Sequence, residues 1–107
     1  MFSIHYYNET VRLAVANLPL DMRARYAAYT ERMKQFGANL GMPHTRAMGS
    51  GLFELRLKGA DGIARVFYCV VQGERIVMLH SFIKKTQATP KRDLEIARRR
   101  KKEMYHA

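Results

Sequence analysis

The sequence lacks the residue sets that several common functional sites require. It has one cysteine, Cys69, so it forms no disulfide within the chain and offers no paired thiolates for zinc. Its four histidines show no HxH or HExxH spacing, and its nine acidic residues are scattered rather than clustered as in a two-metal nuclease. Phosphate loops of the GxxxxGK(S/T) or GxGxxG type are missing too. We therefore expect no metal and no cofactor, and we expect Cys69, among apolar neighbours, to be a buried side chain.

Long apolar runs are also missing. No stretch reaches the roughly 18 apolar residues that a membrane-spanning helix needs, and the N-terminal segment MFSIHYYNET does not have the pattern of a secretory signal. A single cysteine suits a reducing compartment. The sequence therefore predicts a cytoplasmic protein with no membrane partner.

Negative charge is scarce. The 107 residues include 19 Lys and Arg against 9 Asp and Glu, a net charge of +10. A chain of this length is expected to form one domain, residues 1–107. Its charge favours polyanions or an acidic protein partner.

The apolar pattern predicts an α+β fold. A short strand is expected in residues 2–7. A helix capped by Asn8 is expected at 9–17, and a second helix capped by Asp21 is expected to end at about residue 36. Residues 37–51, rich in glycine, are predicted to be a loop. Three strands of an antiparallel meander follow at 52–58, 63–71 and 75–83, and a last helix follows Pro90. The sequence thus predicts a helical hairpin packed on a three-to-four-stranded antiparallel sheet, with a C-terminal helix.

Alternation along these strands predicts one charged face of the sheet. We expect Phe53, Leu55 and Leu57 of LFELRLK (52–58), together with Leu79 of the third strand, to pack on the N-terminal helices. The charged face then collects Glu54, Arg56 and Lys58 from the first strand, Arg65 and Phe67 from the second, and His80, Phe82 and Lys84 from the third. A bulge before Lys84 would turn Lys85 inward instead, so both lysines are candidates.

Two interpretations of this charged face stay open. It is either a solvated surface whose charges oppose edge-to-edge aggregation, or an RNA-binding surface on which Phe67 and Phe82 stack against bases. The last helix adds positive charge that suits contacts to an RNA backbone, from Lys91, Arg92, Arg98 and Arg99. Metal-free RNA cleavage, in which the ribose 2′-hydroxyl attacks the adjacent phosphorus, needs cations and a proton acceptor and donor. The charged face can supply the cations as well as a group that accepts or donates a proton.

Three segments carry a family resemblance when taken together: GLFELR (51–56), RVFY (65–68) and LHSFIKKTQATP (79–90). In this order they resemble the RelE/ParE toxin superfamily, and most closely its phage-derived Gp49-like, HigB-type branch. The resemblance extends over about residues 35–104. It implies a RelE-like fold and the toxin of a type II toxin–antitoxin system. Such a toxin cleaves mRNA on the ribosome without a metal. Its cognate partner is a helix-turn-helix (HigA-type) antitoxin, through which alone it reaches operator DNA.

The resemblance also implies roles for individual residues. Arg56 matches a basic position, Arg65 matches the arginine that stabilises the scissile phosphate, and Lys84–Lys85 match a basic pair. Glu54 stands where well-studied members carry lysine, and it could act as a base or orient the arginines. Those members have a tyrosine near the start of the last helix, whereas this chain reads RDLEIA there. His80 is then the internal candidate for general acid or base.

Two other functions are compatible with the same fold. One is a ParE-like toxin that poisons DNA gyrase. The other is a non-catalytic module that binds RNA or the ribosome.

Overall fold

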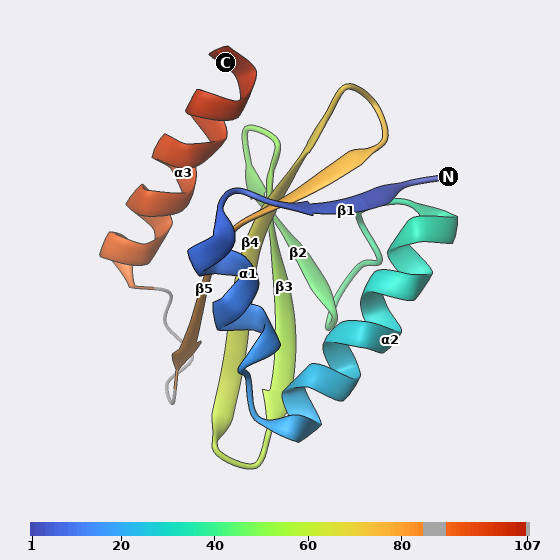
Figure 1. Cartoon of the computed structure of the whole chain (residues 1–107), viewed down its shortest axis with the longest axis vertical. Coiled ribbons are helices and arrows are strands. Elements are labelled where there is room, and N and C mark those ends of the chain that lie inside the picture. Colours follow the sequence, from blue (N-terminus) through green and yellow to red (C-terminus); the bar gives the residue numbers. More distant parts are fainter. Residues whose placement is uncertain (85–89, 107) are drawn as a thin grey trace.

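The computed structural model describes residues 1–84 and 90–106, and these form one mixed sheet with three helices (Figure 1). The elements in chain order are β1 (Ser3–Tyr6), α1 (Glu9–Ala16), α2 (Leu20–Phe36), β2 (Thr45–Gly49), β3 (Leu52–Gly59), β4 (Gly62–Val71), β5 (Arg75–Lys84) and α3 (Lys91–His106). The α+β class and the order of the predicted elements are confirmed.

The sheet has five strands rather than the three or four predicted, in the order β1-β5-β4-β3-β2. β1 runs parallel to β5, and the remaining pairs are antiparallel. The additional strand, β2, lies within the glycine-rich segment that the sequence predicts to be a loop. It is a short edge strand whose register shifts between Ala47 and Gly49, before a tight turn through Ser50 and Gly51, both at positive φ. Such a strand lacks the apolar alternation that sequence patterns detect.

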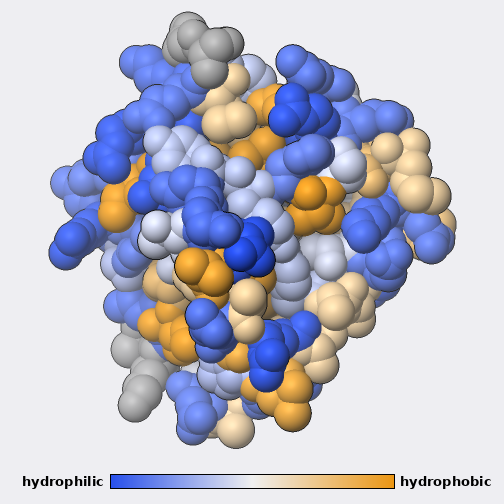
Figure 2. Space-filling view, in the orientation of Figure 1, coloured by the Kyte–Doolittle hydropathy of each residue, from blue (hydrophilic) through white to orange (hydrophobic). Residues whose placement is uncertain are grey.

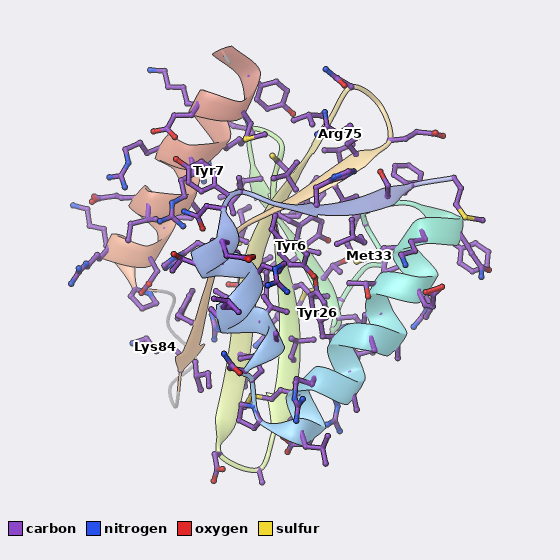
Figure 3. All side chains as sticks on the ribbon, in the orientation of Figure 1. Tyr6, Tyr7, Tyr26, Met33, Arg75 and Lys84 are labelled. Carbon is purple, nitrogen blue, oxygen red and sulfur yellow. The ribbon has the colours of Figure 1, made fainter. Side chains whose placement is uncertain are left out.

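One face of the sheet packs against α1 and α2, and we call it the α1/α2 face. Its core is apolar and includes the side chains of Val11, Val15, Met22, Met33, Leu55, Leu57, Val66, Tyr68, Ile76 and Met78. Asn8 caps α1 as predicted, because its side chain accepts a hydrogen bond from the backbone N–H of Val11. Tyr6 and Tyr26 meet between β1 and α2, with their hydroxyl oxygens 2.8 Å apart (Figure 3).

The opposite face packs against α3, and we call it the α3 face. In Figure 1, α3 lies to the left of the sheet and α2 to the right. The core under α3 contains Leu52, Phe67, Cys69, Val71, Val77, Leu79 and Ala97. Burial raises the pKa of the Cys69 thiol to about 11, as expected of a packing residue rather than a nucleophile.

The predicted orientation of Leu79 is wrong. The register of β4 and β5 shifts so that Phe67 faces His80 while Tyr68 faces Met78. Leu79 is the additional residue of this bulge, and it joins the core under α3 instead of the core under α1 and α2. His80 nevertheless remains on the predicted side of the sheet, because the bulge places Leu79 and His80 on the same face.

Asp21 links α2 to the β3–β4 hairpin rather than capping the helix as predicted. The helix begins at Leu20, and the two carboxylate oxygens of Asp21 accept hydrogen bonds from the backbone N–H groups of Met22 and Ala60, each at 2.8 Å. The bond from Ala60 is the main reason that the pKa of Asp21 is lowered. The contact holds the hairpin against α2.

Candidate functional site

Three cross-strand rows of side chains line the part of the α3 face that carries charge. The first row runs from Arg46 on β2 through Glu54 and Phe67 to His80 on β5. The second row contains Arg56, Arg65 and Phe82, and the third contains Lys58, Ile63 and Lys84. Residues that are partners in neighbouring strands point to the same side of a sheet, so each row is one continuous line of side chains. The predicted charged face is therefore confirmed as a single face.

A buried carboxylate surrounded by arginines occupies the first two rows. The Oε2 atom of Glu54 lies 3.4 Å from Nη1 of Arg65, and its Oε1 atom lies 3.8 Å from Nε of Arg56 and 3.9 Å from Nε of Arg46. The exposed fraction of the side chain increases outward through this set: 0% for Glu54, 1% for Arg65, 19% for Arg56 and 44% for Arg46.

This arrangement separates two roles among the charges. One carboxylate holds three guanidinium groups together, and the group retains a net positive charge. Glu54 and Arg65 lie below the surface, so an incoming anion first meets Arg56 and Arg46. The buried Glu54–Arg65 pair holds the two outer arginines in position, and its charges also act electrostatically on an anion at the surface.

His80 forms the second feature of the site, a hydrogen bond to a carboxylate in the first turn of α3. Its Nε2 atom lies 2.6 Å from Oδ1 of Asp93, and both side chains are partly exposed. The ring of His80 stacks on that of Phe82, with ring centroids 5.8 Å apart. The ring centroids of Phe82 and Phe67 are 5.7 Å apart. A carboxylate on one ring nitrogen orients an imidazole and leaves the other nitrogen to exchange a proton.

Positive side chains surround these two features. Lys58 is exposed and Lys84 is partly exposed at the end of β5 (Figure 3). The predicted RNA-contacting residues Lys91, Arg92 and Arg99 are exposed on α3, where Figure 2 shows hydrophilic side chains along the left edge of the molecule. Arg98 is also exposed, but its guanidinium donates hydrogen bonds to the carbonyl oxygens of Met48 and Gly49. Lys85 lies outside the described residues.

The comparison with known families gives a match that covers the candidate site. Residues 14–102 match the family described as Phage derived protein Gp49-like. The chain belongs to this Gp49-like family. The match spans α2, the whole of β2 to β5, and most of α3, and so includes every residue of the three rows. A search of curated proteins gives no significant match.

Two absences apply to the described part of this Gp49-like chain. Residues 1–84 and 90–106 contain no group of three or more His, Cys, Asp and Glu side chains that could hold a metal ion. Within the same ranges, no helix is long and apolar enough to cross a membrane.

One predicted site residue is wrongly assigned. Phe67 was expected to offer its ring to RNA bases, but it is completely buried in the core under α3. The prediction treated this face as open over its whole length, whereas α3 covers the end that contains Phe67. Phe82, next to it, is only partly buried and keeps a surface for stacking.

Sequence reasoning missed two residues of the site. Arg46 lies in the segment predicted to be a loop, so no strand alternation placed it beside Glu54. Asp93, an acidic residue in a strongly basic helix, was not predicted to belong to the site. The sequence cue for Asp93 was its position in the first turn of the helix, where the helix dipole favours an acidic side chain. In the structure this side chain also contacts a histidine on the sheet.

Proposed function

We propose that this chain is the toxin of a type II toxin–antitoxin pair and acts as an endoribonuclease on mRNA bound to the ribosome. The observation that carries the proposal is the His80–Asp93 pair, which stands on the same face as the arginines around Glu54. It puts a proton-exchanging group beside a fixed set of cations, the two parts that cleavage by a ribose 2′-hydroxyl requires. Membership of the Gp49-like family is consistent with a toxin.

In the proposed reaction the 2′-hydroxyl oxygen attacks the adjacent phosphorus and the bond from phosphorus to the 5′-oxygen breaks. The products are a 2′,3′-cyclic phosphate and a 5′-hydroxyl end. The 2′-oxygen loses its proton and the 5′-oxygen gains one. His80 makes one of these two proton transfers and water makes the other, while Asp93 holds the ring of His80 in place. The rigid sheet and the helix N-terminus fix this pair relative to the phosphate.

The cations stabilise the negative charge that develops on the phosphoryl oxygens. The proposed contacts to the scissile phosphate are Arg56, in the row of Phe82, and Lys84, in the next row, and both are partly exposed. Arg65 acts mainly from below, where Glu54 holds it, and Phe82 supports a base by stacking. The basic side chains of α3 bind the flanking backbone.

The proposal includes the partners that the family resemblance implies. These are mRNA on the ribosome and a helix-turn-helix antitoxin that carries the toxin to operator DNA, all in the cytoplasm. Cleavage needs neither a metal ion nor a cofactor in this scheme, because the attacking oxygen comes from the RNA itself.

The chemistry of the new RNA ends tests the proposal. Purified protein is added to ribosomes programmed with a defined mRNA, and the 5′ end of the downstream fragment is analysed. A 5′-hydroxyl is expected, and a 2′-deoxy substitution at the cleaved nucleotide is expected to block the reaction. A 5′-phosphate end, or cleavage of the 2′-deoxy template, would overturn attack by the 2′-hydroxyl. Intact mRNA together with inhibited gyrase would favour the ParE-like alternative.

A further inference from the structure

A pocket of about 280 Å³ opens at the edge of the sheet, at the β3 end of the second and third cross-strand rows. β2 pairs with β3 only as far as Leu55, so the following part of β3 has β4 on one side and no strand on the other. The segment before β2 closes this gap, and the backbone N–H of Arg56 donates a hydrogen bond to the carbonyl oxygen of His44 at 2.9 Å. The pocket is lined by Arg25, Tyr29, Pro43, His44, Arg56, Lys58 and Ile63.

The lining combines positive charge with aromatic rings. Arg25, Arg56 and Lys58 contribute three permanent positive charges, and none of the described residues that line the pocket is acidic. The rings of Tyr29 and His44 contact each other with centroids 4.5 Å apart at an angle of 43°. Cations suit a phosphate, and an aromatic pair suits a base that stacks on one of its rings.

The two rings are held in place rather than free to collapse into the pocket. Tyr29 packs against the core between α2 and the sheet, and His44 is partly buried beside it. The backbone hydrogen bond between His44 and Arg56 ties the loop to β3. A stacking surface that is ordered before binding loses little conformational entropy when a base arrives.

The pocket is continuous with the candidate site. Arg56 and Lys58 belong both to its lining and to the second and third cross-strand rows, which continue to Phe82 and Lys84 on β5. Neighbouring strands are about 4.8 Å apart, so the distance from β5 to β3 is on the order of 10 Å, a short step along an RNA strand.

We infer that this pocket binds one nucleotide of the RNA next to the cleaved bond, with its base against the Tyr29–His44 pair and its phosphate near Arg25 and Lys58. The inference rests on the proposed function and adds a second subsite to it. An acidic peptide of a protein partner would use the cations but would leave the aromatic pair unexplained, so the observations favour RNA.

The experiment measures binding, not cleavage. A short fluorescent oligoribonucleotide with 2′-O-methyl groups, which the 2′-hydroxyl mechanism cannot cut, is titrated with the full chain at low salt. Arg25→Ala and His44→Ala are each expected to weaken binding about tenfold, in line with the loss of one phosphate contact or one stacked base. His44→Phe, which keeps an aromatic ring, is expected to restore most of the affinity.

Arg23→Ala is the matched control, since Arg23 is an exposed arginine on the same helix and lines a different pocket, between α1 and α2. It is expected to change the affinity less than twofold. An equal loss in the Arg23 and Arg25 variants would reduce the effect to net charge and overturn the subsite. Undetectable binding of the oligonucleotide by the wild type would also overturn the subsite. The same holds if the pocket variants bind RNA normally but bind the antitoxin less tightly.

The result also separates the two proposals. A protein that binds the oligonucleotide through this pocket but leaves ribosome-bound mRNA intact has the subsite without the proposed nuclease activity. If the protein cleaves mRNA, and Arg25→Ala and His44→Ala change neither oligonucleotide binding nor cleavage, then it has the activity without the subsite.

Discussion

The two faces of this sheet are built from the same strands, yet they differ in what they bury. The α1/α2 face buries an apolar core over its length, with Leu55, Leu57, Val66 and Tyr68 under the two helices. The α3 face buries apolar side chains at one end only. At the other end it buries Glu54 and Arg65 and exposes more arginine and lysine.

The requirements of a stable fold explain the residues buried on the α1/α2 face, but they do not explain the buried charges on the α3 face. An apolar core stabilises the fold without specific polar partners, whereas a buried ion pair contributes little net stability because both charges lose their hydration. Apolar residues of similar volume would satisfy folding at least as well at Glu54 and Arg65. This difference is the reason for proposing the functional site on the α3 face.

Glu54→Gln is the change expected to disturb the α3 face most. It leaves the guanidinium of Arg65 buried without its carboxylate, which costs about 3–5 kcal/mol of unfolding free energy. Chemical denaturation measures the change. Glu31→Gln removes an exposed carboxylate on α2 that pairs with Lys34, and it is expected to cost at most about 0.5 kcal/mol. Equal, small effects of both variants would mean that the buried cluster is not held by its charges.

Leu55→Ala is the corresponding change on the α1/α2 face. Leu55 is fully buried under the helices, so its truncation is expected to lower the unfolding free energy by about 3 kcal/mol. RNA cleavage by the folded fraction should stay near the wild-type rate, because the side chain points away from the rows. A loss of activity beyond the unfolded fraction would contradict the separation of the two faces. Ile83→Ala, at a largely exposed position of β5, is the control.

Asp93→Asn tests the positioning of His80 by α3. It keeps the shape but weakens the bond to the ring, and we expect about a tenfold lower cleavage rate with little change in the unfolding free energy. The rate with saturating ribosomes should fall while the half-saturating concentration stays constant. Asp93→Glu should recover part of the rate. A similar loss in both variants, with lower stability, would indicate a purely structural pair.

The smallest expected effect concerns Asp21, whose pKa is lowered by the hydrogen bond from Ala60. A carboxyl group with a lowered pKa in the folded state stabilises the fold above its unfolded pKa, near the ordinary value of 3.8, and loses this contribution as the pH falls through the folded pKa. The stability difference between wild type and Asp21→Asn, measured at pH 7 and again below pH 3.8, should therefore shrink on acidification. A constant difference would contradict the role of this carboxylate.

The sequence predicted the parts of the fold that depend on local pattern. Alternation along β3 and β4 put Glu54, Arg56 and Arg65 on one face correctly, because each strand repeats every two residues. It did not predict the bulge at Leu79 or the parallel pairing of β1 with β5, since both depend on contacts between distant segments.

Strand alternation also could not predict which side chains of the site are buried. The pattern places Arg65 and Phe67 on a face, but only the position of α3 and of neighbouring side chains decides that both are buried. The pairing of His80 with Asp93 likewise depends on where the last helix begins relative to β5. Face and charge could be predicted from the residues, whereas burial and partners needed the three-dimensional structure.

The most direct test of the central claim is the mapping of transcript 5′ ends in cells after a brief pulse of expression. Wild type is compared with His80→Asn and with Arg23→Ala, which lies on the α1/α2 side. The account predicts new ends inside coding regions, in phase with codons, for wild type and Arg23→Ala, and none for His80→Asn. Growth arrest without new ends, or an unchanged pattern in His80→Asn, would contradict it.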